Sequence, residues 1–270
     1  MSKENGIIES QLKIGITGSH GFIGGSMFNR FTESNLDVIR LGRDGQVPQE
    51  INCIFDLAAY GNIHGQDDLQ EINQANYERV IELLDNSYGK LVVLTSSSSV
   101  LLNTPTPYSE SKEKMEKYVK QWVKDTGENV IVARPSTIIG VGENKNHLIP
   151  KLIHSAITGE QMDFVGEPTH DFLSVDDFID ALIILSLAVK DYKGQTFNIS
   201  AGESISNETV KDTVVDIVGK QPNIRRVESL RKYDTERWEV PNYKMRSLGW
   251  KPTKTLKQTI KEMVEAYERN

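Results

Sequence analysis

The stretch Lys13–Gly25, KIGITGSHGFIGG, decides the fold of this chain. Its first apolar residues sit among small ones, as in a short buried strand, and a Thr-Gly pair ends that strand. From Phe22 onward the apolar residues recur at helical spacing. The strand therefore turns sharply into a helix, and Gly18, Gly21 and Gly24 lie at the turn.

The three glycines each have a physical reason at this spacing. Gly18 allows the tight turn, Gly21 lets the backbone approach a pyrophosphate, and Gly24 lets the helix pack closely against the strand. Free backbone N–H groups at the start of the helix, together with the helix dipole, hold an anion. An ordinary glycine-rich turn is the alternative, but here strand, spacing and helix agree. The stretch therefore predicts a dinucleotide-binding turn.

Length and charge narrow the classes of function. The chain has 270 residues, of which 38% are hydrophobic and 26% charged, which is ordinary for a soluble globular protein of one large or two small domains. Its net charge of −7 argues against a nucleic-acid groove and against an anionic membrane surface. We therefore expect no nucleic-acid partner and no membrane partner.

Cysteine and histidine usage bears on metals and on the compartment. Cys53 is the only cysteine of the sequence, so neither an internal disulfide nor a thiolate metal cluster is expected. The five histidines show no metal-ligand spacing, so no metal is expected. We find neither a signal-peptide pattern nor an apolar run long enough to span a bilayer. These features predict a reducing, cytoplasmic setting.

Strands and helices alternate along the first half of the chain. Strands are predicted over 37–41, 53–59, 91–95 and 130–133, with helices over 69–84 and 108–123. This alternation predicts an α/β fold with a Rossmann-type, doubly wound parallel sheet. After Arg134-Pro135 the rhythm changes, and the predicted elements are helices over 147–157, 175–189, 207–218 and 256–267 and strands over 161–165 and 196–199.

Polar residues with catalytic potential follow the strand over 91–95. Ligands of open α/β sheets bind at the carboxyl ends of the strands, where the four serines Ser96–Ser99 lie. Tyr108 and Lys112 open the next helix, and their spacing of four puts them on one helix face. A lysine ammonium beside a phenol lowers a pKa that starts near ~10. Tyr108 is therefore a candidate general acid/base, with a serine hydroxyl holding a carbonyl or carbinol oxygen.

Together with the dinucleotide turn, this constellation resembles the extended short-chain dehydrogenase/reductases of the nucleotide-sugar epimerase/dehydratase/reductase group. The resemblance runs from about Lys13 to the C-terminus. The segments that carry it are 17–24 (TGSHGFIG), 57–59 (LAA), Asn76, the serine run, Tyr108/Lys112, Arg134-Pro135, 170–177 (HDFLSVDD), 197–199 (FNI) and 248–252 (LGWKP). It implies a Rossmann domain over 1–139 with 171–200. It also implies a smaller C-terminal α/β domain over 140–170 with 201–270 for the nucleotide-sugar substrate.

The resemblance implies roles for individual residues. Ser97, Tyr108 and Lys112 would be catalytic, with Tyr108 passing a proton to or from the sugar oxygen and Lys112 also binding the nicotinamide ribose. The nucleotide sugar would contact Ser98, Thr137 and Arg237. The cofactor would be held by Gly18, His20, Gly21, Phe22, Ile23, Gly24, Arg43, Leu57, Ala58, Ala59, Asn76, Lys112 and Pro135.

One departure from the family pattern bears on the cofactor. Many relatives end the second strand with an acidic residue that binds the adenine ribose hydroxyls. Here Gly42 stands at that position, between Arg40 and Arg43. A missing carboxylate and a nearby arginine accommodate a 2′-phosphate, which favours NADP. NAD stays the alternative, because Asp44 could be the acid shifted in register.

Other departures bear on the reaction. The serine stretch lacks the Thr-Asp-Glu of 4,6-dehydratases, and Ser99 stands where 3,5-epimerase/4-reductases carry a cysteine. What remains is chemistry at one carbinol: NADPH-dependent reduction of a nucleotide-activated 4-keto-6-deoxy sugar or, as the alternative, 4-epimerisation. A third reading, a nucleotide sensor without activity, fits less well, because the Ser/Tyr/Lys set is intact.

Two connections are shorter than in most extended relatives. Ser97 and Tyr108 lie close together in sequence, which shortens the loop on the substrate side. The connection from Asp44 to Asn52 is too short for the usual helix and third strand, so we expect the sheet to lose that edge. The family commonly dimerises through two helices of each subunit, and we expect a homodimer through the helices over 69–84 and 108–123.

Overall fold

The computed structural model describes residues 12–63, 65–229 and 237–269. The chain forms two compact units, and each contains segments that are distant in sequence. Unit 1 consists of residues 1–100, 105–134 and 179–197. Unit 2 consists of residues 101–104, 135–178 and 198–270.

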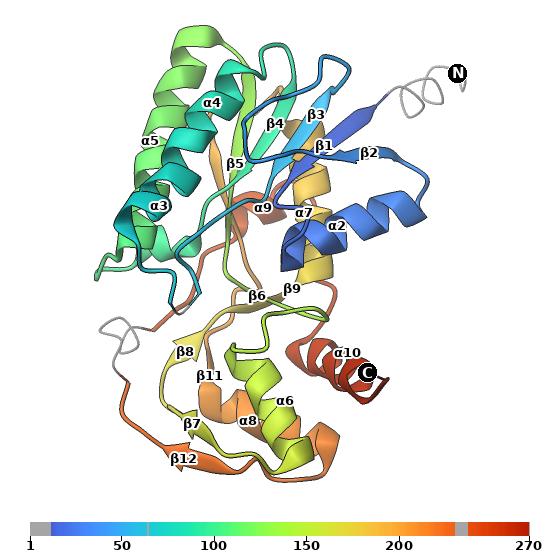
Figure 1. Cartoon of the computed structure of the whole chain (residues 1–270), viewed down its shortest axis with the longest axis vertical. Helices are drawn as coiled ribbons and strands as arrows, with labels where there is room; N and C mark the ends of the chain where they lie inside the picture. Colours follow the sequence, from blue (N-terminus) through green and yellow to red (C-terminus); the bar gives the residue numbers. More distant parts are fainter. Residues whose placement is uncertain (1–11, 64, 230–236, 270) are drawn as a thin grey trace. The chain divides into compact units, whose positions relative to one another are not determined.

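Unit 1 is built on a six-stranded sheet with the order β10-β5-β4-β3-β1-β2 (Figure 1). The strands β2, β1, β3, β4 and β5 pair in parallel. This is the doubly wound, Rossmann-type α/β sheet that the alternation of strands and helices predicted. The strand bounds are β1 Lys13–Thr17, β2 Asp37–Arg40, β3 Cys53–Asp56, β4 Leu91–Thr95, β5 Asn129–Pro135 and β10 Thr196–Ile199.

Strand β2 forms one edge of this sheet. The connection from Leu41 to Asn52 contains neither helix nor strand. Backbone bonds fasten both of its ends to β1, because Leu41 N–H donates to Ile16 O and Asn52 N–H to Lys13 O, each at 2.9 Å. The prediction that the sheet loses the strand beyond β2 is confirmed, because β2 is the edge strand and the next strand, β3, pairs with the other side of β1.

Four helical segments cover one face of the sheet (Figure 1). They are α3 (Leu69–Asn73), the π-helical turn η1 (Gln74–Glu78), α4 (Arg79–Asp85) and α5 (Pro107–Thr126). The apolar residues of α4 and α5 pack with those of β3, β4 and β5 in one core that includes Val80, Leu83, Met115, Val119 and Trp122. The helix predicted over 69–84 therefore exists, but a π turn interrupts it.

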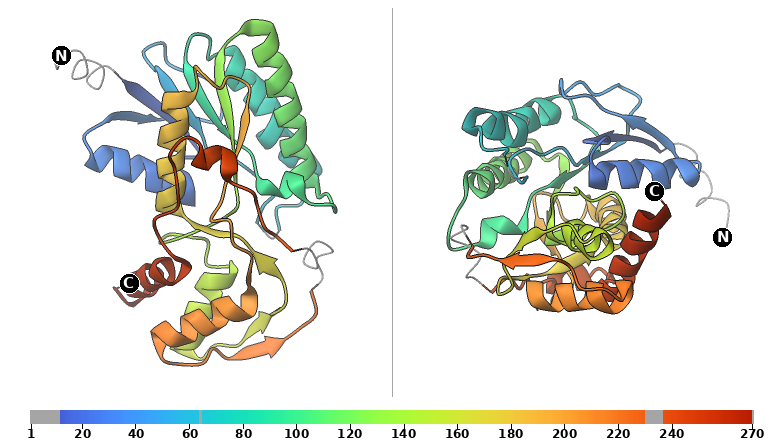
Figure 2. Two further views of the ribbon diagram at one scale, coloured as in Figure 1. Left: turned by 180° about the vertical axis from the view of Figure 1, so that it is seen from behind. Right: turned by 60° about the horizontal axis from the view of Figure 1, so that its bottom comes forward.

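Two helices lie on the opposite face of the sheet, α2 (Phe22–Glu33) and α7 (Val175–Ala188) (Figure 2). Phe31 of α2 packs edge-to-face on Phe55 of β3, with ring centroids 5.8 Å apart. Arg30 of α2 forms an ion pair with Asp180 of α7. The burial of Met27 and Phe31 and this ion pair fix α2, and with α2 the glycine-rich turn that precedes it.

Unit 2 has a core of its own, which contains Leu152, Phe164, Phe172, Val214 and Ile260. Its main helices are α6 (Leu148–Thr158), α8 (Asn207–Val218) and α10 (Leu256–Arg269), with a short α9 (Tyr243–Arg246). Three two-stranded ladders complete it: β6 (Thr137–Ile139) with β9 (Phe172–Ser174), β7 (Met162–Phe164) with β12 (Ile224–Arg226), and β8 (Thr169–His170) with β11 (Ile205–Ser206).

The outward faces of α4 and α5 are polar. The exposed positions of α5 include Glu113, Lys117, Lys120 and Lys124, while its apolar residues pack in the core. The expectation of a homodimer through these helices assumed a second apolar face, and these two helices do not offer one. The homodimer itself stays a prediction. Among the described residues, no helix is both long enough and apolar enough to cross a membrane.

Candidate active site

The glycine-rich turn joins β1 to α2 and leaves no space for larger side chains. Gly18 adopts a left-handed φ of +64°, and a Cβ there would lie 2.6 Å from the carbonyl carbon and oxygen of Leu57. A Cβ on Gly24 would lie 2.3 Å from the Gly18 carbonyl oxygen. The predicted tight turn at Gly18 is therefore confirmed, and Gly24 allows the helix to approach this turn.

Several polar groups at this turn have no partner among the residues that the structure describes. Helix α2 begins after Gly21, which provides no side-chain cap for the first N–H groups. The first turn of α2 contains no acidic residue, and the hydroxyl of Ser19 is buried without a hydrogen bond. A helix N-terminus with unpaired N–H groups and no competing carboxylate fits the pyrophosphate of a dinucleotide.

The two arginines near the end of β2 have different surroundings. The guanidinium of Arg40 donates a hydrogen bond to the carbonyl of Ser19 and lies 3.8 Å from the centre of the Phe28 ring. Arg43 is exposed, and no described residue forms a hydrogen bond or ion pair with it. A hollow of about 350 Å³ next to this segment is lined by residues including Arg40, Gly42 and Asp44. Arg43 is therefore free to meet a ligand, whereas Arg40 supports the turn.

Ser97, Tyr108 and Lys112 lie together in unit 1, as predicted. The Ser97 hydroxyl forms a hydrogen bond with the Tyr108 side chain and also accepts from the Ser99 hydroxyl at 2.9 Å. Tyr108 lies in the first turn of α5, which a Thr106–Ser109 capping box starts. Lys112 lies one turn later and is 1% exposed. The sequence folds this way because the capping box fixes the register of α5 directly after the serine run.

The pKa of Tyr108 differs from the sequence-based expectation. Burial raises the pKa of Tyr108 to about 12, and the hydrogen bond from Ser97 opposes this rise. The Lys112 ammonium donates to the Thr95 carbonyl at 3.0 Å and lies 5.9 Å from the centre of the Tyr108 ring. The prediction of a lowered Tyr108 pKa is therefore wrong, because burial outweighs the hydrogen bond from Ser97. At neutral pH Tyr108 is a neutral phenol.

Two buried pairs of charged residues, which the sequence did not predict, lie in the same unit. Asp56 ends β3, is 1% exposed and forms an ion pair with Arg79 of α4 at 2.8 Å. Glu116 of α5 pairs with Arg134 of β5 and accepts a hydrogen bond from Ser96 at 2.5 Å. The available signal was the charge of Asp56, which interrupts the apolar stretch 53–59. What the sequence could not give was the pairing of Asp56 with Arg79 across 23 positions.

Asn76 holds the segment that follows β3. Its amide oxygen accepts from the Tyr60 N–H at 3.1 Å, and its amide nitrogen donates to the Tyr60 carbonyl at 2.7 Å and to the Ser111 hydroxyl at 3.0 Å. Asn76 is fully buried in the π turn η1, a feature frequent at functional sites. Because these bonds occupy its amide, Asn76 supports the backbone that follows Ala59.

The structure also places the other residues that were predicted to hold a cofactor. His20 and Ala59 are exposed, whereas Leu57 and Ala58 are half-buried beside Gly18. Phe22 and Ile23 are the first two residues of α2, and Pro135 ends β5. The segment 57–59 and the glycine-rich turn thus form one continuous backbone surface in unit 1.

The residues predicted to contact substrate are divided between the units. Ser98 is buried in unit 1, at the start of the 3₁₀ turn η2 (Ser98–Leu101). Thr137 begins β6 in unit 2, and its N–H donates to the Asp171 carbonyl at 2.9 Å. Arg237, also in unit 2, is exposed and paired with Glu239 at 2.7 Å. Their contact with a substrate stays a prediction.

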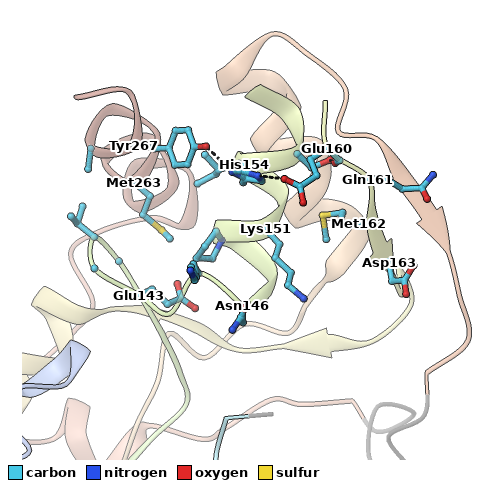
Figure 3. A pocket seen from close by; sticks show the side chains of 18 of the residues that line it. Glu143, Asn146, Lys151, His154, Glu160, Gln161, Met162, Asp163, Met263 and Tyr267 are labelled. Carbon is cyan, nitrogen blue, oxygen red and sulfur yellow. Dashed lines mark hydrogen bonds and ion pairs between the residues drawn. The ribbon is translucent and has the colours of Figure 1, made fainter. Parts of the chain in front are cut away.

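Unit 2 contains a pocket of about 820 Å³ that the sequence reading did not predict (Figure 3). It lies along α6 and α10, with Lys151, Met162 and Met263 among its lining residues. The His154 ring bridges the Tyr267 hydroxyl and the Glu160 carboxylate, each at 2.7 Å. Glu143 also lines the pocket, and burial raises the pKa of this carboxyl against the opposing hydrogen bond from His147. Among the described residues, no cluster of three potential metal ligands occurs.

Comparison with curated proteins identifies relatives that act on nucleotide sugars. dTDP-glucose 4,6-dehydratase 1 of Escherichia coli (strain K12) is 30% identical over 175 residues, which are 61% of this chain and 48% of the relative. GDP-6-deoxy-D-talose 4-dehydrogenase of Aggregatibacter actinomycetemcomitans is 26% identical over 256 residues, which are 83% of this chain and 86% of the relative. The chain thus spans about half the length of the dehydratase and most of the length of the dehydrogenase.

Solved structures share the fold over nearly the whole chain. MoeE5 in complex with UDP-glucuronic acid and NAD superposes with a TM-score of 0.84 and 22% identity, covering 95% of this chain and 99% of that one. RMD from Pseudomonas aeruginosa, complexed with NADPH, gives a TM-score of 0.83 and 21% identity, covering 96% and 99%. The model of the NAD dependent epimerase/dehydratase family matches residues 47–200. The chain therefore belongs to this family and, with it, to the extended short-chain dehydrogenase/reductases that include nucleotide-sugar epimerases and dehydratases.

Proposed function

We propose that this protein reduces the 4-keto group of a nucleotide-activated 4-keto-6-deoxy sugar with NADPH. The observation that carries the proposal is the grouping of Ser97, Tyr108 and Lys112 after β4, beside a serine run that contains no carboxylate and no cysteine. Reduction of a ketone creates an alkoxide, which needs a proton at the moment it forms. A phenol that holds its proton at neutral pH is ready to give it. A 4-epimerase uses the same phenol first as proton acceptor and then as proton donor, so the two reactions differ in whether the cofactor is exchanged in each turnover.

Each side chain of the constellation has a defined task in this proposal. Tyr108 donates the proton to the sugar oxygen, and Ser97, which is bonded to Tyr108, orients that oxygen. The turn around Gly18, Gly21 and Gly24 holds the dinucleotide, and Lys112 binds its nicotinamide ribose. The bound nicotinamide supplies the hydride.

The remaining side chains near the end of β4 support reduction over the related reactions. The run Ser96–Ser99 contains no carboxylate and no cysteine that could remove a proton from the sugar ring. Cys53 does not replace them, because it is buried in β3, where burial raises its pKa to about 12. GDP-6-deoxy-D-talose 4-dehydrogenase, which the chain matches over most of its length, carries a 4-dehydrogenase activity in its name. Chemistry at a single carbinol is consistent with the composition of the serine run and with the name of this relative.

We further propose NADP rather than NAD as the cofactor. No carboxylate follows β2 at Gly42, and Arg43 is exposed without a partner among the described residues. An arginine in this place can pair with a 2′-phosphate. A cytoplasmic setting and a homodimer complete the proposal, and both rest on the family resemblance and on the sequence.

The cofactor that the protein retains on purification tests the proposal. We expect a protein without tightly held cofactor that binds NADPH more strongly than NADH, because a reductase exchanges its cofactor in every turnover. The measurement is a phosphate and redox analysis of any nucleotide released on denaturation, together with titration of both reduced cofactors. Stoichiometric retained NAD would contradict the proposal and favour the 4-epimerase.

A further inference from the structure

The Ser97 hydroxyl receives two hydrogen bonds from a single residue, Ser99. The Ser99 N–H donates to Ser97 Oγ at 3.1 Å, and the Ser99 hydroxyl donates to the same oxygen at 2.9 Å. A serine hydroxyl has two acceptor lone pairs and one proton to donate. Both acceptor positions of Ser97 are therefore filled by the chain, and the capacity that remains to it is the proton.

This proton is directed at Tyr108, because the Ser97 hydroxyl forms a hydrogen bond with the Tyr108 side chain. Since Ser97 has no lone pair left, Ser97 is the donor in this bond and the phenol oxygen is the acceptor. The proton of Tyr108 is not used in the bond. The three hydroxyls thus form a chain with one direction, from Ser99 through Ser97 to Tyr108, which we call the hydroxyl chain.

The local fold keeps Ser99 in this place. Ser99 lies in the 3₁₀ turn η2, and the N–H of Val100 in the same turn donates to the Ser97 carbonyl at 3.3 Å. Ser99 is 8% exposed, so bulk water has little access to its hydroxyl. Because η2 follows β4 and Tyr108 lies in the first turn of α5, the hydroxyl chain connects the end of a strand to the start of a helix.

We propose that Ser99 is a positioning residue, which fills both acceptor positions of Ser97 and so makes Ser97 an obligate proton donor. A keto oxygen that enters the site then meets donors on Ser97 and on Tyr108. Without the Ser99 hydroxyl, Ser97 has a free lone pair, and Tyr108 can direct its proton to Ser97 instead of the sugar. Ser99 is not among the residues predicted for the site. The proposal deepens the proposed function, but the hydroxyl chain belongs to the protein alone.

Infrared spectroscopy of protein with isotope-labelled tyrosine tests the direction of the Ser97–Tyr108 bond, with neither sugar nor cofactor present. The C–O stretch of a phenol lies at higher frequency when its hydroxyl donates a hydrogen bond than when its oxygen accepts one. Tyr108→Phe assigns the Tyr108 band. We expect Ser99→Ala to move this band upward, because Tyr108 then donates to the released lone pair of Ser97.

The matched control is Ser186→Ala. Ser186 of α7 lies in the same unit, is also 8% exposed and donates its hydroxyl to the Ile183 carbonyl at 2.7 Å. Its replacement removes a hydroxyl of equal burial away from the hydroxyl chain. We expect the Tyr108 band of Ser186→Ala to match that of wild type.

Two further variants separate the hydrogen bond from packing. Ser99→Thr and Ser99→Val introduce side chains of nearly the same shape that differ in the hydroxyl. Ser99→Thr should keep the wild-type band, and Ser99→Val should shift it as Ser99→Ala does, so this pair decides the question if Ser99→Ala fails to fold. In a Ser97→Ala background, no Ser99 variant should move the band further, because Ser99 acts through Ser97.

Turnover of a 4-keto sugar gives a second measurement. We expect Ser99→Ala to lower kcat about 3- to 10-fold, the effect of one neutral hydrogen bond, while KM and cofactor affinity stay close to wild type. Ser99→Thr should restore kcat, and the loss should vanish when residue 97 is already alanine.

The outcomes distinguish a positioning role from a merely structural one. An unmoved Tyr108 band in Ser99→Ala, or equal bands in Ser99→Thr and Ser99→Val, would overturn the proposal. The same shift in the Ser97→Ala background would also overturn it, because the effect would then come from packing. Unchanged kcat in Ser99→Ala would overturn the role in proton transfer. If wild type reduces no ketosugar, the proposed function fails, and the infrared result by itself decides whether Ser99 directs the Ser97 proton.

Discussion

The Nζ atom of Lys112 lies 5.9 Å from the centre of the Tyr108 ring and donates its hydrogen bond to the Thr95 carbonyl instead of the phenol. The two side chains share a helix face, as their spacing requires, but the lysine is fixed to the end of β4. Tyr108 takes its hydrogen bond from Ser97. Burial thus raises the pKa of the phenol, and the hydrogen bond to Thr95 at the end of β4 holds the lysine.

Replacing Tyr108 with phenylalanine should remove the proton donor and little else. We expect kcat to fall by ~10²–10⁴, because proton transfer by a positioned group contributes about that much. Cofactor affinity should stay within a factor of about two, since the ring is retained and only one hydroxyl is lost. Steady-state kinetics and fluorescence titration measure the two effects. The control is Tyr118→Phe, on the same helix but away from Ser97 and Lys112. Near-normal turnover in Tyr108→Phe would show that another group donates the proton.

The exposed arginine should decide between the two cofactors. Arg43→Ala is expected to weaken NADPH binding about 10- to 100-fold and NADH binding hardly at all, because a charge-assisted contact to a 2′-phosphate contributes roughly 1.5–3 kcal/mol. Arg40→Ala is the matched comparison, because Arg40 is bound to Ser19 and Phe28 and should affect both cofactors alike. Equal losses of affinity for NADPH and NADH in Arg43→Ala would show that Arg43 does not contact the 2′-phosphate.

Burial of Glu143 should make stability depend on pH. Its carboxyl has a raised pKa in the folded chain, so the folded state binds this proton more tightly than the unfolded state does. The folded state therefore loses stability as pH rises from the unfolded value, near ~4.3, through the folded one. Glu143→Gln removes this loss, and we expect a higher Tm at neutral pH with a difference that vanishes below about pH 4. A Tm difference that is the same at every pH would show that the effect is not ionisation.

A dimer through α4 and α5 should be sensitive to salt. The exposed positions of α4 include the acidic Glu82 and Asp85, and those in the middle of α5 include the basic Lys114, Lys117 and Lys120. Contact between such surfaces is electrostatic, and exposed charges are screened beyond about 8 Å at physiological ionic strength. Sedimentation should therefore show dimers at low salt that dissociate as salt is raised. Monomers at micromolar concentration in low salt would contradict the predicted homodimer.

Much of the fold follows from local signals in the sequence. The turn at Gly18 was predictable because it needs a glycine and because Gly18, Gly21 and Gly24 follow a strand at the spacing of a dinucleotide-binding turn. The parallel sheet was predictable because segments with strand and helix periodicity alternate along the chain. The helix over 207–218 lies where it was predicted, between the Ser206 cap and the left-handed Gly219. In contrast, β6, β8, β9, β11 and β12 have two or three residues each, too few for any period. Their pairing is set by tertiary contacts.

The site was predictable in its members and not in its electrostatics. Tyr108 and Lys112 could be paired from their spacing, since four residues make one helix face. The pKa of Tyr108 could not be predicted, because it depends on burial that the neighbouring chain provides. The Asp56–Arg79 pair joins a strand to a helix, and no local pattern links them. The boundaries of the two units, such as that after Arg134, fall within β5 and are likewise set by packing.

The most direct test of the proposed function is to mix the enzyme with NADPH and a panel of 4-keto-6-deoxyhexoses on dTDP, CDP, GDP and UDP. Cofactor absorbance and product analysis then give the ratio of NADPH oxidised to sugar reduced. We predict that at least one ketosugar is converted to its 4-hydroxy product with one NADPH consumed per molecule. Interconversion of a UDP-hexose with its C4 epimer, without net oxidation of cofactor and with every ketosugar untouched, would contradict the proposal.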